Sequence, residues 1–163
     1  MNNQDVEQEL NKCWSELNNV KSLIDSAGVL SSLTPYLTKY AIIRSCGVLE
    51  TSFKTIIADF CSDQSKEQVK RFIRVRVREG SANPSFKNIC TTLKNFDPVW
   101  NKNFKLRLDG ELNKPQILTS LESLVEARNV FAHGGSPTGS IADILTYFQH
   151  SRRIIELLDE VVR

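Results

Sequence analysis

The sequence predicts an all-α protein, a helical bundle that forms a single domain over residues 1–163 and carries an additional basic helical segment. Apolar residues recur at steps of three and four through most of the chain, which is the spacing of one face of an α-helix. Proline follows Thr or Asp where two of these segments begin, and Gly lies where several of them end. A length of 163 residues with 40% apolar content is enough for one compact core.

The first two segments are predicted to be long helices. The first ends with "SAG" near Gly28, and its apolar stripe is Val6, Leu10, Cys13, Leu17, Val20 and Ile24. The second begins at "LTPY", where Thr34 is the expected cap and Pro35 fits the first turn, and it runs to about Cys61. Because this helix is apolar on most sides, we expect it at the centre of the bundle.

The third segment is basic and has two interpretations. Ser65 with Gln68 three residues later has the pattern of a capping box, which predicts a helix that ends at Gly80. The alternation of apolar and basic residues in "FIRVRVR" also fits a short strand. The pattern alone leaves this choice open.

Four further helices follow, separated by short loops such as "SANPS". In the stretch "FDPVW", Asp97 is a residue type that caps helices, and Pro98 is a type that favours the first helical position. The four helices are expected from about Ser85 to Asn95, from Pro98 to near Gly110, from about Lys114, and from about Ser140.

Composition excludes several classes of protein. The chain has no apolar run long enough to cross a membrane and no basic start followed by an apolar block, so we expect a cytoplasmic protein. Its four cysteines lie far apart without a C-x-x-C pair and are expected to be buried thiols: Cys13, Cys46, Cys61 and Cys90. Without a metal-ligand cluster or a Gly-rich phosphate loop, neither a metal nor a cofactor is expected.

Positive charge is concentrated in the middle of the chain. The net charge is only +2, but residues 65–114 contain twelve Lys and Arg against five Asp and Glu. The densest part is "KEQVKRFIRVRVREG", where the side chains expected to bind RNA phosphates are Lys70, Arg71, Arg74, Arg76 and Arg78. A solvated helix face explains the same pattern equally well.

The stretch "VEARNVFAHGGSPTG", residues 125–139, combines polar side chains suited to phosphate chemistry. Arg128 and Asn129 lie shortly before His133, one of only two histidines, and before a Gly pair that ends a helix. Metal-independent RNA cleavage needs a proton acceptor for the 2′-hydroxyl, a proton donor for the leaving 5′-oxygen, and positive charge beside the phosphorane. Imidazole and guanidinium supply these functions.

The spacing of these side chains argues for two copies of the chain. Arg128 and His133 are five positions apart, which is about 140° around an ideal helix, so they converge poorly within one helix. A shared site therefore needs a distorted last helical turn or a second copy of the chain that faces the first. One histidine also serves poorly for both proton transfers. A homodimer with a composite site resolves both difficulties. The simpler alternative is that His133 only closes a helix.

Most of the chain resembles HEPN domains, which are all-α dimeric modules of prokaryotic defence and toxin systems. "RNVFAHG" resembles their R-x4-6-H signature, and "IIRSCGVLETSFKTII" and "NPSFKNICTTLKNFDPVW" look like the corresponding parts of the RiboL-PSP type. The resemblance implies a metal-independent endoribonuclease that cleaves single-stranded RNA, with an antitoxin or defence-system protein as partner. It makes Arg128 and His133 catalytic. Asn129 would be the polar residue that follows the arginine, and Glu50 a supporting residue.

The resemblance also has departures and alternatives. HEPN toxins paired with nucleotidyltransferase antitoxins often carry a tyrosine where this chain has Gly135, so regulation by adenylylation of that position is not expected. Glu50 is alternatively a buried carboxylate paired with Arg44 or a helix amide, and His150 is expected at the edge of the bundle.

The alternative for the whole chain is a catalytically silent helical module for dimerisation or RNA binding. Silent members usually lose the arginine or the histidine, and this chain keeps both.

Overall fold

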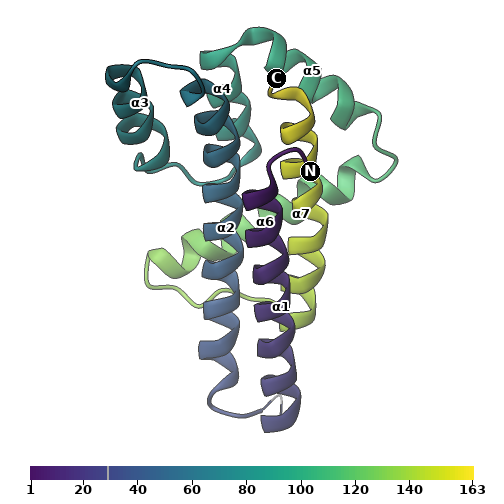
Figure 1. Ribbon diagram of the computed structural model, residues 1–163. Helices are drawn as coiled ribbons and strands as arrows, with labels where there is room; N and C mark the ends of the chain where they lie inside the picture. Colours follow the sequence, from purple (N-terminus) through teal and green to yellow (C-terminus); the bar gives the residue numbers. More distant parts are fainter. Residues whose placement is uncertain (29) are drawn as a thin grey trace.

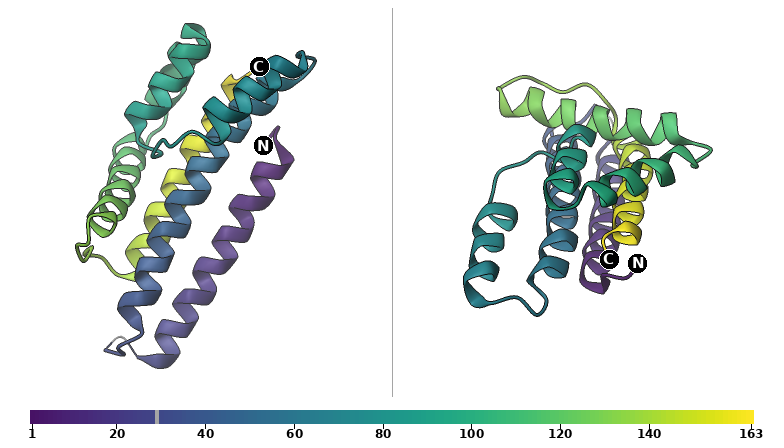
Figure 2. Two further views of the ribbon diagram at one scale, coloured as in Figure 1. Left: turned by 90° about the vertical axis from the view of Figure 1, so that its left-hand side faces the viewer. Right: turned by 90° about the horizontal axis from the view of Figure 1, so that it is seen from above.

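The computed structural model describes residues 1–28 and 30–163, and in these residues it is helical without a strand. Three long helices lie side by side: α1 (Gln4–Ala27), α2 (Thr34–Ser62) and α7 (Ile141–Val161) (Figure 1). A fourth, α6 (Lys114–Ala132), crosses this group so that its C-terminal end projects past α2 (Figures 1 and 2). The predicted all-α bundle is therefore confirmed.

The remaining helices cover the end of the bundle where both chain termini lie (Figure 1). The basic segment forms α3 (Glu67–Ile73), which continues into a π-helical turn, η1 (Arg74–Arg78), and both pack on α2. After a loop come α4 (Phe86–Phe96) and α5 (Pro98–Asp109), which pack on each other. In this arrangement α2 contacts α1, α6, α7 and the basic segment, as predicted from its apolar surface.

The core forms where the apolar stripes of the long helices meet. The six α1 residues predicted from their spacing, Val6 to Ile24, are all buried. Phe53 of α2, Phe104 of α5 and Phe148 of α7 are among the largest fully buried side chains. Because 3.6 residues make one helical turn, the recurrence at three and four residues identified the buried face of each helix.

Two predicted helix starts are wrong in detail. Pro35 does lie in the first turn of α2, but Thr34 is already helical and its hydroxyl donates to the carbonyl of Gly28 at 3.3 Å. The capping box at Ser65 is also absent, since α3 begins at Glu67 and the Ser65 hydroxyl donates back to the carbonyl of Cys61 at 2.8 Å. In both cases the hydroxyl donates to a carbonyl earlier in the chain instead of accepting from the helix amides. A Ser or Thr can form either bond, so the residue type alone does not decide between them.

The strand interpretation of "FIRVRVR" is wrong as well. The segment is helical through Ile73 and then forms the π-helical turn, where the Glu79 amide donates to the carbonyl of Arg74 at 3.0 Å. In the described part of the chain no strand lies beside it, so its backbone groups must pair within the segment. Only Ile73 is buried there, which leaves the other apolar residues of the segment at its surface.

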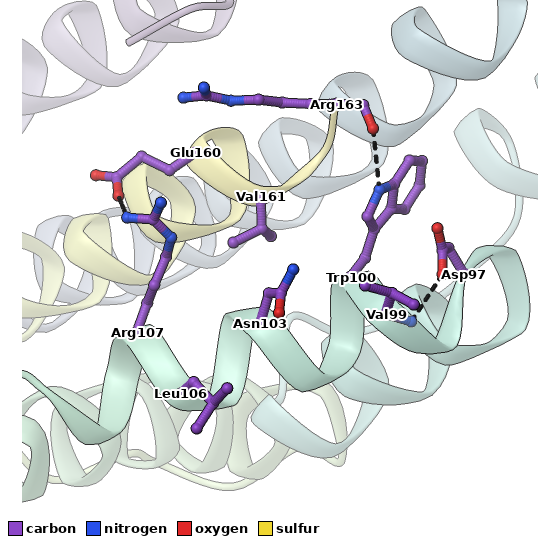
Figure 3. A pocket seen from close by; sticks show the side chains of 9 residues that line it. All are labelled: Asp97, Val99, Trp100, Asn103, Leu106, Arg107, Glu160, Val161 and Arg163. Atoms are coloured by element: carbon purple, nitrogen blue, oxygen red, sulfur yellow. Dashed lines mark hydrogen bonds and ion pairs between the residues drawn. The ribbon is translucent and has the colours of Figure 1, made fainter.

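The end of the bundle near the termini contains a hollow of about 670 Å³ (Figure 3). The indole of Trp100 donates to the carbonyl of Arg163 at 3.2 Å, and Arg107 pairs with Glu160 at 2.6 Å. No histidine lines it. These contacts tie α5 to the last helix, and we assign this hollow a structural role.

Cys13 and Cys46 are expected to resist alkylation in the folded protein. Both side chains are buried in the core, and burial raises the pKa of each thiol to about 12, so little thiolate forms at mildly alkaline pH. Cys61 and Cys90 are only half-buried. Brief treatment with iodoacetamide, followed by peptide mass spectrometry, should modify these two first. Modification of Cys46 at the same rate would contradict the expectation.

Candidate active site

The C-terminal end of α6 is closed by the Gly pair in a fixed geometry. His133 is the cap residue, and Gly134 follows with φ of +81°, a conformation that favours glycine. The Gly134 amide donates to the carbonyl of Phe131 and the Gly135 amide to that of Val130, both at 2.9 Å. This pair of bonds is a Schellman motif, and it holds the exposed His133 at the helix end.

Gly135→Ala is expected to distort this helix end. A Cβ atom at position 135 would lie 2.7 Å from Cγ1 and 2.9 Å from the carbonyl oxygen of Val130, so the backbone must shift. We expect a loss of about 2 kcal/mol in the free energy of unfolding, measured by urea titration. Gly47→Ala on α2 is the control, because its Cβ would meet open space and alanine favours a helix. Equal loss in both variants would contradict the expectation.

A hollow of about 650 Å³ opens beside His133. Its polar lining is one face of α6, formed by Glu122, Glu126, Asn129 and His133 at steps of four, three and four. Ser85, the cap residue of α4, lines it from the other side. Asn129 and His133 were predicted from the sequence; the two glutamates were not, although their helical spacing was a usable signal. Ser85 is brought there by tertiary packing and has no such signal.

Arg128 lies on another face of α6, beside α2. It is half-buried and close enough to Cys46 to oppose, through its positive charge, the rise that burial causes in the pKa of that thiol. It does not line the hollow at His133. Its Nη1 donates to Oδ1 of Asn129 at 3.3 Å, so Asn129 connects Arg128 to that hollow. The structure thus separates Arg128 from His133 as the helical angle predicts.

Glu50 is paired, but with partners other than those anticipated. Its Oε1 accepts from the ammonium of Lys54 and, at 3.2 Å, from the backbone amide of Ala82. Arg44 instead pairs with Glu16 of α1 at 2.5 Å, which lowers the pKa of that glutamate. The pairing of Glu50 with Arg44 is therefore wrong, because the two side chains leave α2 in different directions.

The Glu50 pair joins α2 to the loop before α4. Lys54 is only 5% exposed and also donates to the carbonyl of Gly80, so both charged groups hold backbone of residues 80–82. Burial raises the pKa of the Cys46 thiol, the charge of Arg128 lowers it and the charge of Glu50 raises it. The supporting role of Glu50 stays a prediction.

The predicted RNA-binding side chains project from α3 and η1 and are exposed. Three of the five form ion pairs: Lys70 with Glu67 at 3.0 Å, Arg74 with Glu79 at 3.7 Å, and Arg78 with Asp59. Arg71 and Arg76 form none in the described part of the chain. Exposed ion pairs contribute little free energy, so phosphates can compete for these cations. The cations lie on α3 and η1, however, and not at the end of α6.

His150 lies apart from this region. Its Nδ1 is 2.9 Å from the hydroxyl of Ser120, and the ring is half-buried at the contact between α6 and α7. It lines a separate hollow with Arg152 and Arg153. The second histidine is thus at the bundle edge, as anticipated, and gives a natural control for His133.

Comparison with known proteins gives one family match. The family model described as RiboL-PSP-HEPN matches residues 7–163. No curated protein and no solved structure matches the chain. Over the described residues, 1–28 and 30–163, none of the helices combines the length and apolarity that crossing a bilayer requires.

Proposed function

The chain belongs to the RiboL-PSP-HEPN family, and from this premise we propose that it is a metal-independent endoribonuclease that cleaves single-stranded RNA at a composite site of a homodimer. One observation carries the proposal: an exposed histidine is fixed at the end of α6 beside a hollow that Asn129 also lines, and Arg128 donates to Asn129 from the neighbouring face. The role we propose is that of a cytoplasmic toxin or antiphage effector held in check by a partner protein.

The chemistry assigns one task to each side chain. His133 accepts the proton of the ribose 2′-hydroxyl as that oxygen attacks phosphorus, or returns a proton to the 5′-oxygen as the P–O bond breaks. Arg128 faces the negative charge that gathers on the phosphorane. Because Asn129 Oδ1 accepts from Arg128, its amide nitrogen remains a donor for a phosphate oxygen. The products are a 2′,3′-cyclic phosphate and a 5′-hydroxyl.

A second copy is supported by an uncovered apolar stripe on α2. Tyr36, Tyr40 and Ile43 follow helical spacing and are 72%, 49% and 45% exposed. They adjoin the end of α6, where Lys39 lies over the Phe131 ring with its ammonium 5.5 Å from the ring centre. Exposed apolar stripes of this kind mark interfaces. Covering this one with its symmetric copy would bring a second α6 end to the site.

The test is cleavage of end-labelled single-stranded RNA in excess chelator. Wild type is expected to cleave and to leave cyclic phosphate ends, while His133→Ala and Arg128→Ala should each be slower by at least about a hundredfold. His150→Ala is the matched histidine control and should cleave like wild type. Intact RNA with every variant at high protein concentration would favour the silent RNA-binding or dimerisation module. Equal cleavage by all variants would place the activity elsewhere.

A further inference from the structure

Another hollow lies between the basic segment and α4. It encloses about 420 Å³, with walls from α2, α3, η1, the following loop and α4. Two exposed aromatic rings flank it, Phe72 of α3 at 63% exposure and Phe96 of α4 at 38%, and Phe53 lies buried beneath them. Exposing two phenyl rings beside one concave surface is costly in water, so this surface is suited to a flat apolar ligand.

The polar groups at this hollow suit a nucleotide. Arg76 is one turn beyond Phe72 on the same helical face, and its guanidinium reaches solvent at the edge of the hollow. Lys54 also lines it, and its bonds to Glu50 and Gly80 use two of its three protons. Asn95 adds an amide with both donors and an acceptor.

This combination favours nucleic acid over an apolar side chain of a protein. Unpaired bases bind by stacking on aromatic rings while nearby cations hold the backbone. The hollow is lined by Arg76 of the basic segment, and the helices that form its walls carry two further exposed cations, Arg71 on α3 and Lys94 on α4. An apolar side chain of a protein would contact the rings but would gain nothing from the cations.

Helix α4 connects this hollow to the end of α6. Ser85, before its first turn, lines the hollow at His133, and Phe96, its last residue, lines the hollow at Phe72. At the rise of an α-helix, Ser85 and Phe96 are about 16 Å apart. That length corresponds to about five stacked nucleotides. One short strand of RNA can therefore reach both hollows.

We propose that the hollow at Phe72 and Phe96 binds an unpaired base of the RNA about five nucleotides from the phosphate that is cleaved. The base stacks on the two rings, and Arg76 holds a neighbouring phosphate. The identity of the ligand as the cleaved RNA rests on the proposed function. The site anchors single-stranded RNA through stacking, which tolerates different bases.

The test measures binding without cleavage. A labelled 2′-O-methyl oligonucleotide, which cannot form a cyclic phosphate, is titrated with the full chain and followed by fluorescence anisotropy. Phe72→Ala and Phe96→Ala are each expected to weaken binding about tenfold, since they remove a stacking surface. Phe72→Trp should retain affinity, and Phe72→Leu should behave like Phe72→Ala because leucine offers no ring.

The matched control is Phe60→Ala. Phe60 is 46% exposed on α2 but packs edge-on against Trp100, away from this hollow, so its loss should leave RNA affinity unchanged. Unchanged affinity of Phe72→Ala and Phe96→Ala overturns the proposal. So does wild-type affinity of Phe72→Leu, because RNA binding would then not depend on stacking against this ring.

The two proposals fail in different ways. Cleavage that needs His133, in a protein whose RNA affinity ignores both phenyl rings, overturns only the base-binding hollow. RNA affinity that depends on both rings, in a protein that never cleaves, overturns only the nuclease.

Discussion

A mixed dimer with one wild-type chain and one His133→Ala chain is expected to cleave RNA at least about a hundredfold more slowly than the wild-type homodimer. The reason is that one imidazole serves poorly for both proton transfers, so a composite site needs His133 from each copy. Differently tagged chains, co-expressed and purified through both tags, give the mixed dimer. A mixed dimer of wild-type and His150→Ala chains is the control and should cleave at the full rate.

The cleavage rate of the mixed dimer also tests a second possible site, in which Glu126 and His133 of one chain act together. Glu126 lines the hollow at His133 from the same face of α6, so one chain holds both a carboxylate and an imidazole there. If each chain works alone with this pair, the mixed dimer will keep half of the wild-type rate, and Glu126→Gln will lose activity. Half activity would therefore contradict the two-histidine site and assign the second proton transfer to Glu126.

Helical spacing predicted most of the fold because each long helix buries one face. The α1 stripe, the central place of α2 and the ends near Gly28 and Gly110 follow from periodicity and from residues that break helices. The basic segment was ambiguous because Ile73 is its only buried residue in α3 and η1, so it lacks the buried face that defines a period. A period can be determined only where packing imposes one.

The candidate site was predictable in part for the same reason. The separation of Arg128 from His133 is a property of one helix and follows from counting residues. The approach of Ser85 to His133, and the salt bridge of Glu50 to Lys54 with its bond to Ala82, depend on how a loop and α4 pack. Contacts between elements distant in sequence leave no periodic signal in a single chain.

Glu50→Leu is expected to lower the free energy of unfolding by about 3 kcal/mol, because it leaves the ammonium of Lys54 buried without a countercharge. Urea titration measures the loss. The double variant Glu50→Leu, Lys54→Met should recover most of it, since apolar side chains of similar volume replace both charges. A single variant as stable as wild type would show that Lys54 finds water or another partner.

The double variant also separates the two roles open to Glu50. Glu50→Leu removes the carboxylate that accepts from the Ala82 amide, and Ala82 lines the hollow at Phe72, so the single variant should bind RNA more weakly as well as unfold more easily. If the stable double variant cleaves like wild type, neither the Glu50 carboxylate nor its hold on the loop is needed for cleavage, and any loss in the single variant came from the buried charge of Lys54. If it is stable and binds RNA but does not cleave, the Glu50 carboxylate acts at the Arg128 side of the site itself, as the family resemblance implies.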